Sequence, residues 1–146
     1  MARTLRVKNL RDIPARRKLG AKVKLCGHNT AFRGRIGVMQ VTLPPLGRLK
    51  EHRHEESESL LFILRGEGKL IHSERRKEVM VYPDDLINIP ARTWHCLEAS
   101  EKGLEYLSVQ EPPIQFQGRI LDTTLRGAAA RRPATATSRQ PSKAVA

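Results

Sequence analysis

The organisation of this chain follows from residues 52–66, which read HRHEESESLLFILRG. His52 and His54 stand two positions apart, and side chains at this spacing point to the same side of an extended strand. Both imidazoles can therefore reach one point in a cavity, as a pair of metal ligands must. The apolar run at 60–64, followed by Gly66-Glu67-Gly68, is typical of a buried strand that enters a tight turn.

A second stretch, residues 84–95, reads DDLINIPARTWH and supplies a third histidine, His95, at the start of another short strand. An isolated His-x-His pair would most simply be two solvated histidines at a strand end. A third histidine in its own motif favours a shared metal site on His52, His54 and His95. Imidazole nitrogens suit iron, manganese, nickel, copper or zinc, whereas calcium and magnesium prefer oxygen ligands.

These two stretches resemble the two sequence motifs of the cupin superfamily. The first motif has a glycine before His-x-His, then a glutamate and a glycine, and the second ends in Pro-x-Gly-x-x-His. The matching residues are Gly47, His52, His54 and Gly66 in the first motif and Asp85, Pro90 and His95 in the second, with Arg92 where glycine is usual. The resemblance covers roughly residues 35–110 and implies an all-β double-stranded β-helix, or jelly-roll barrel, around one divalent metal.

The glutamate of the first motif is the one ligand that the sequence leaves open. Counting back from Gly66 by the usual spacing reaches Ser59, whereas Glu58 stands one residue earlier. A slip of one residue turns a strand side chain to the other face, so Glu58 is a fourth metal ligand only if a bulge restores its direction. Otherwise Glu58 belongs to a solvated acidic loop, and the Ser59 hydroxyl hydrogen-bonds a bound water or the substrate.

Turn residues separate many short apolar segments in the middle of the chain. We expect strands near 22–26, 35–43, 60–66, 68–73, 77–82, 86–89, 94–99 and 104–110. Turns are expected at 27–29, 44–47, 66–68, 83–85 and 101–103. Because no helix of three turns is expected among them, the strands must bury their apolar faces against each other, as in a sandwich, jelly roll or barrel.

Length and composition indicate one domain without a membrane span. At 146 residues the chain is long enough for a single core. No apolar stretch approaches the roughly 20 residues that cross a bilayer, and the N-terminus lacks the apolar segment of a secretory signal. We therefore expect a cytoplasmic protein whose two cysteines, Cys26 and Cys96, are reduced.

The net charge of +12 lies almost entirely in the two ends of the chain. Residues 1–24 carry nine Lys or Arg and one acid, and residues 119–146 carry six and one, so residues 25–118 have a net charge of −1. A nucleic-acid reader would carry its positive charge on the folded face that docks. We therefore divide the chain into a basic arm at 1–24, a barrel at 25–118 and a basic, largely disordered tail at 119–146, with no specific nucleic-acid binding.

Several other side chains are candidates for the cavity wall. They are Met39, Arg48, Phe62, Arg92, Trp94 and Tyr106. We assign Arg48, Ser59, Phe62 and Arg92 to substrate binding, because an arginine that faces the metal would pair with a carboxylate or enolate. His28 and His72 fall outside the motifs and are expected at the surface.

The most direct functional interpretation is a small-molecule dioxygenase that uses Fe²⁺, with Mn²⁺, Ni²⁺, Zn²⁺ or Cu²⁺ as other metals the site could hold. Three-histidine sites of this kind occur among dioxygenases of the family that the motifs resemble. Two alternatives remain open at this point: a binding module that senses a small ligand, and a metal-dependent isomerase or lyase. An open sheet edge and the resemblance also predict a homodimer.

Overall fold

The computed structural model describes residues 7–26, 34–116, 119–127 and 138–139. It is almost entirely β-structure, with a 3-10 turn, η1, at Leu10–Asp12. The strands are β1 Arg16–Lys18, β2 Ala21–Leu25, β3 Gly37–Leu43, β4 His52–Arg53, β5 Glu58–His72, β6 Lys77–Val81, β7 Leu86–Ile89, β8 His95–Glu111, β9 Gln115–Phe116, β10 Arg119–Ile120, β11 Thr124–Leu125 and β12 Ser138–Arg139. The all-β jelly-roll architecture expected from the sequence is confirmed.

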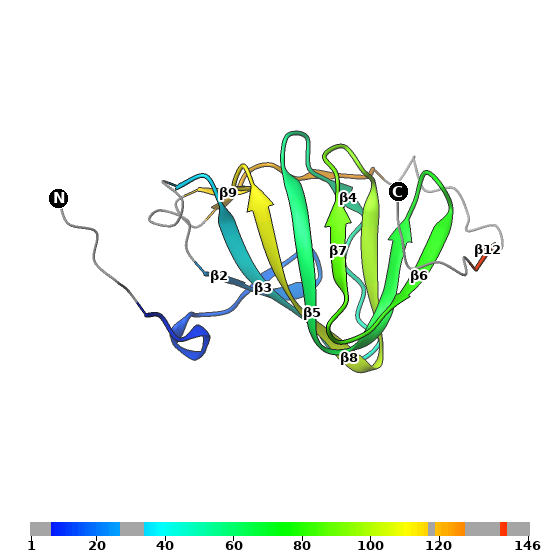
Figure 1. Ribbon diagram of the computed structural model, residues 1–146, viewed down its shortest axis with the longest axis horizontal. Coiled ribbons are helices and arrows are strands. Elements are labelled where there is room, and N and C mark those ends of the chain that lie inside the picture. Colours follow the sequence, from blue (N-terminus) through cyan, green and yellow to red (C-terminus); the bar gives the residue numbers. More distant parts are fainter. Residues whose placement is uncertain (1–6, 27–33, 117–118, 128–137, 140–146) are drawn as a thin grey trace.

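Two long antiparallel strands, β5 and β8, form the centre of the sheet (Figure 1). The first part of β5 pairs with β7, and its last part pairs with β6. On the side away from β5, β8 pairs with β3. Strand β3 pairs in turn with β2, and β2 pairs with β1. The chain thus curls one antiparallel sheet around a single core, and the pairing partners on either side of β5 and β8 change where these strands bend.

Alternating apolar residues build that core. Along β3 every second residue is buried, so Met39, Val41 and Leu43 face inward. Strand β5 repeats the pattern with Leu61, Ile63 and Leu70. Period-two alternation places all of these side chains on one face of the sheet, and burying that face is the main source of stability.

Two of the turns expected from the sequence are wrong. Residues 66–68 and 101–103 lie inside the continuous strands β5 and β8, which do not reverse there. The pairing register of the two strands shifts between Ile63 and Arg65 and again between Gly66 and Gly68. Gly66 and Gly68 therefore lie at a bulge that bends the strand. A glycine inside a strand pattern can mark a bulge of this kind as well as a turn.

Close backbone approach explains why glycine is needed at these bends. A Cβ on Gly66 would lie 2.0 Å from the carbonyl oxygen of Gly103, and Gly66 itself has a φ of +78°. A Cβ on Gly68 would lie 2.2 Å from the carbonyl oxygen of Glu98. The two long strands can approach each other this closely at the bend only because both positions lack a side chain.

The boundaries of the barrel also differ from those expected. Ala21 and Val23 of β2 lie in the core, so part of the segment at 1–24 belongs to the sheet. At the other end β11 pairs with β4, so residues after 119 also pack on the barrel. In Figure 1 the orange segment that contains β10 and β11 runs across the top of the barrel. Most of the expected disordered tail, residues 128–137 and 140–146, lies outside the described residues.

No helix long and apolar enough to cross a membrane is found among the described residues.

Candidate metal centre

Three strand ends bring the histidines together. His52 lies on β4 and is directly paired with His95, the first residue of β8. His54 follows β4 by one residue, and its side chain returns to the same face two positions after His52. The ring centroids are 4.4 Å apart for His52 and His95, 5.1 Å for His52 and His54, and 5.7 Å for His54 and His95.

Each of the three rings is held by a hydrogen bond from Nδ1 to a backbone carbonyl. His52 Nδ1 lies 2.6 Å from the oxygen of Lys50, and His95 Nδ1 lies 2.8 Å from that of Thr93. His54 Nδ1 lies 2.6 Å from the oxygen of Asp122. A carbonyl can only accept, so Nδ1 carries the proton in each ring and the lone pair of Nε2 is left for a ligand.

The three imidazoles are also kept neutral. Burial is the main cause that lowers the pKa of His52, to about 4, and the nearby His54 lowers it further. Burial likewise lowers the pKa of His54, and it holds the pKa of His95 well below its ordinary value. Neutral imidazole is the form that binds a metal, so no proton has to be displaced near pH 7.

A divalent transition metal fits this donor set. The ligand atoms of His52, His54 and His95 all lie within 4.8 Å of one another, and all three residues are buried. Metal–nitrogen bonds of about 2.0–2.1 Å place two ligands of one ion at most about 4 Å apart, so small ring rotations suffice. The Nδ1 hydrogen bonds supply the outer contacts that fix the rings of metal-binding histidines.

The three histidines line a cavity inside the barrel. It has a volume of about 40 Å³, room for about three water molecules. Its walls are mostly apolar, and the polar side chains that line it beside the histidines come from Lys18, Ser59, Tyr106, Ser108 and Thr123. Met39 and Tyr106, expected in the wall, do line it.

Ser59, and not Glu58, faces this cavity. The pairing of β5 with β8 runs without irregularity from Glu58 opposite Glu111 to Ser59 opposite Gln110. The bulge that would turn Glu58 inward is therefore absent at this position, and its side chain is exposed. Ser59 is 2% exposed, and its hydroxyl has no hydrogen-bond partner in the structure.

Three of the four residues assigned to substrate binding lie elsewhere. Phe62 is 38% exposed because it alternates with the inward-facing Leu61 and Ile63. Arg48 pairs with Glu98 on the outside of the barrel. The side chain of Arg92 is exposed at a turn, where its backbone N–H donates to the carbonyl of His54 at 2.7 Å. Only Ser59 of that group lines the cavity.

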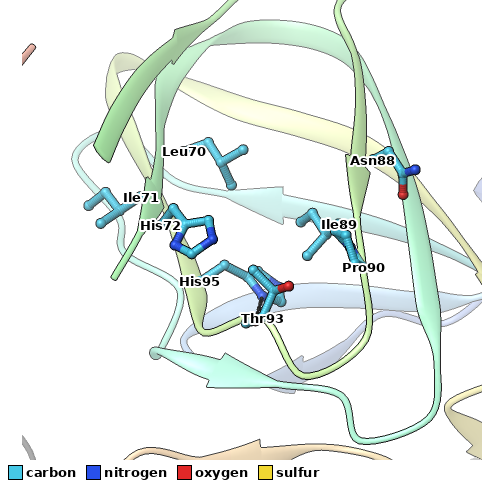
Figure 2. A pocket seen from close by; sticks show the side chains of 8 residues that line it. All are labelled: Leu70, Ile71, His72, Asn88, Ile89, Pro90, Thr93 and His95. Atoms are coloured by element: carbon cyan, nitrogen blue, oxygen red, sulfur yellow. Dashed lines mark hydrogen bonds between the residues drawn. The ribbon is translucent and has the colours of Figure 1, made fainter. Parts of the chain in front are cut away.

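His72 is not a surface residue as expected. It is 6% exposed and is paired directly with His95 across β5 and β8, so its ring lies beside the metal centre. Figure 2 shows His72 and His95 on one side of a second, smaller hollow, with Ile89 and Pro90 on the other side. The ring of His72 is not part of the three-histidine group, and its Nδ1 accepts from the backbone of Arg75 at 3.3 Å. His28 lies outside the described residues.

Two residues of the site stand at positions that no sequence spacing marks. Asp122 contacts both His54 and the loop after it, although 68 positions separate it from His54. Lys18, an exposed residue of β1, lines the mouth of the cavity. The one available hint for Asp122 is that it is the only acid in an otherwise basic segment, residues 119–146.

Both cysteines are free in the structure. Cys96 is fully buried beside Arg48, whose Nη2 lies 3.5 Å from the sulfur. Burial raises the pKa of the Cys96 thiol to about 11, so it remains protonated and unreactive at neutral pH.

Comparisons with known proteins agree with this geometry. A family model for the cupin domain matches residues 39–110, which include all three histidines. No curated protein sequence matches the chain.

Several solved structures share the fold at low sequence identity. A predicted oxalate decarboxylase from Thermotoga maritima has a TM-score of 0.66 and 21% identity, and the match covers 73% of this chain and 99% of that one. The polyketide cyclase RemF from Streptomyces resistomycificus has a TM-score of 0.64 and 20% identity, covering 75% and 80%. KdgF from Halomonas sp. has a TM-score of 0.60 and 16% identity, covering 70% and 90%.

Proposed function

Because the chain belongs to the cupin superfamily, we propose that it is a metal-dependent enzyme that acts on a small organic anion, with dioxygenase chemistry on Fe²⁺ as its reaction. The main support for the proposal is that the rings of His52, His54 and His95 are all held in the same way. Each ring donates from Nδ1 to a carbonyl and leaves Nε2 free toward the other two. Such an arrangement supports binding of one metal ion.

The charge of the site favours an anionic substrate. Three neutral imidazoles leave both positive charges of a divalent ion uncompensated, and no carboxylate lines the cavity among the described residues. A carboxylate or enolate oxygen of the substrate would supply the missing negative charge. Lys18 at the cavity mouth adds a cation that attracts the same group.

The size and walls of the cavity restrict the rest of the substrate. About 40 Å³ admits the metal-binding head of a ligand, and a larger body must extend through the mouth beside Lys18 and Thr123. Apolar side chains form most of the wall, so they exclude water from the reacting group. We therefore expect a small anion with an apolar body, such as a keto acid or a diketone enolate.

Two buried hydroxyls would orient that anion. Ser59 offers an unpartnered hydroxyl in the cavity. Burial raises the pKa of Tyr106 above its ordinary value, so its phenol stays protonated and is able to donate a hydrogen bond to a bound anion. A bound divalent metal would supply Lewis acidity and, with iron, redox chemistry.

The lack of a free general base favours oxygen chemistry over isomerisation. The histidines that line the cavity near Ser59 are the proposed ligands, and the described lining holds no carboxylate that could remove a proton. Isomerase or lyase chemistry needs such a base at the reacting carbon. An oxygen-dependent reaction needs no such base when its substrate binds as an anion.

Oxygen consumption tests the proposal. Protein loaded anaerobically with Fe²⁺ is mixed with a panel of small keto acids and diketones, and oxygen uptake is followed beside substrate loss. We expect uptake matched to substrate loss for at least one compound, and none in a His52→Ala variant. Substrate loss without oxygen would replace the dioxygenase by an isomerase or lyase, and tight binding without any turnover would leave a binding module.

A further inference from the structure

The three candidate ligands do not obtain their carbonyl partners in the same way. His52 and His95 each donate to the residue two positions before them, so these contacts are local. His54 donates to Asp122, which lies 68 positions later in the chain. The orientation of one ligand therefore depends on a segment that only the fold brings near.

The carboxylate of Asp122 is bound by the loop that follows His54. Its Oδ1 accepts from the N–H of Glu55 at 2.7 Å, and its Oδ2 accepts from Glu56 at 3.1 Å and Ser57 at 3.0 Å. Three successive backbone donors thus converge on one side chain. The same residue holds the ring of His54 through its own carbonyl, so Asp122 fixes the ligand and the loop together.

Asp122 and the residues after it lie along β4, and we call residues 122–126 the strap. Strand β11 pairs Thr124 with Arg53 and Leu125 with His52. Arg126 ends the strap with an ion pair to Glu51, in which Nη1 lies 2.7 Å from Oε1. Its guanidinium also lies 5.3 Å from the ring centre of Trp94, which Arg53 approaches to 4.8 Å.

We propose that Asp122 is a positioning residue of the metal centre, and that docking of the strap at 122–126 and binding of the metal are coupled. The inference rests on the proposed function in that it takes His52, His54 and His95 as the ligands. The hydrogen bond to the Asp122 carbonyl keeps the proton of His54 on Nδ1. The lone pair of Nε2 would then be available to the ion. Coupling is reciprocal, so a metal that needs His54 in this orientation also stabilises the docked strap.

A carboxylate is required at this position because all three loop groups are donors. An asparagine offers one oxygen and turns its NH₂ toward an N–H of Glu56 or Ser57. We therefore expect Asp122→Asn and Asp122→Ala to release the loop at 55–57 and to shift the backbone carbonyl of residue 122 away from His54. Zn²⁺ binding should then weaken by about 10- to 100-fold, the usual effect of losing an outer contact to a metal ligand. Asp12→Asn, at an exposed aspartate of η1, is the matched control and should leave the affinity unchanged.

The tautomer of His54 separates positioning from a general loss of structure. Metal-free protein labelled with ¹⁵N-histidine is compared by NMR with its Asp122→Asn variant. We expect His54 to lose its fixed Nδ1-protonated signal, while the locally held His52 and His95 keep theirs. An unchanged His54 signal, or an equal change at all three histidines, would overturn the positioning role.

Hydrogen exchange on the unaltered protein tests the coupling without any variant. Adding Zn²⁺ should slow amide exchange at residues 55–57 and 124–126, and unchanged exchange there in the Zn²⁺-loaded protein would overturn the coupling. A protein that binds no Zn²⁺ at all would refute the proposed function, and the NMR comparison on metal-free protein would still decide the role of Asp122. Wild-type affinity in both Asp122 variants would refute that role while leaving the metal centre intact.

Discussion

Ser59 and Glu58 are neighbours in sequence and lie on opposite faces of β5. Since Glu58 is exposed and Ser59 faces the histidines, we expect Glu58→Ala and Ser59→Ala to keep the full metal content. The reason is that the site uses three imidazoles and no carboxylate. Metal analysis of the two purified variants checks this. A loss of metal in Glu58→Ala as large as in a histidine variant would mean that the carboxylate is a ligand after all.

The buried histidines predict how stability depends on pH in the metal-free protein. Burial holds the pKa of His52 at about 4 and lowers those of His54 and His95, whereas an unfolded histidine has a pKa of about 6.5. Below pH 6.5 the unfolded chain takes up protons that the folded chain refuses. The free energy of unfolding should therefore be highest at about pH 7 to 8 and fall steadily from about pH 6.5 to about 5.

Urea unfolding at a series of pH values measures this effect. The window above about pH 5 isolates the histidines, because a carboxyl whose pKa the fold lowers, such as that of Asp122, loses its contribution only as the pH falls below about 5. Replacing His52 and His95 by glutamine should flatten the slope. Stability that stays constant between about pH 6.5 and 5 in the unaltered protein would show that the three histidines are not buried in the neutral form.

Part of the metal centre could be predicted from the sequence, for a physical reason. The spacing of His52 and His54 follows from strand geometry alone, and their partner His95 lies in a motif of its own. Whether Glu58 or Ser59 faces inward depends on the register of β5, which a sequence leaves open by one residue. Asp122 could not be found, because its contacts arise only when the chain end folds back onto β4.

At the scale of elements, the bend in β5 and β8 is the feature that closes the sheet around the metal centre. Gly66→Ala places a Cβ 2.0 Å from the carbonyl oxygen of Gly103 at a positive φ of 78°. We expect this change to lower the free energy of unfolding by at least about 2 kcal/mol, since strained backbone and a steric clash both contribute. Chemical denaturation provides the measurement.

Gly127→Ala is the matched control, because a Cβ at that position meets nothing within 4 Å. It should change stability by less than about 0.5 kcal/mol. Equal stability of the two variants would show that the chain does not bend at Gly66 as described.

The same bend explains which elements could be predicted. The strand expected at 86–89 matches β7, and that expected at 77–82 is close to β6, because turn residues flank both. Glycines at 66 and 103 were interpreted as reversals, although a glycine at a positive φ serves a bulge equally well. Local sequence cannot distinguish the two, since the choice depends on whether a partner strand continues alongside.

At the scale of the whole molecule, the homodimer expected from the sequence stays a prediction. Large apolar side chains are exposed on the outer face of β5 and β7, with Leu60 at 42%, Phe62 at 38% and Leu86 at 64%, and Phe62 is paired with Leu86. If a second copy covers this face, Phe62→Glu should convert a dimer to a monomer, because it would bury an unpaired charge. Light scattering at micromolar concentration checks this, with Met80→Glu as the control. A dimer that survives Phe62→Glu would place the interface elsewhere.

Elemental analysis of protein purified without a chelating tag shows whether His52, His54 and His95 share one metal ion. We expect about one transition-metal ion per chain, and a fall to about a tenth of that or less when any one of the three is replaced by alanine. His72→Ala, which removes a buried histidine that is paired with His95 but lies outside the ligand group, should keep the metal. Full metal content in all three alanine variants would show that these histidines do not share a metal ion.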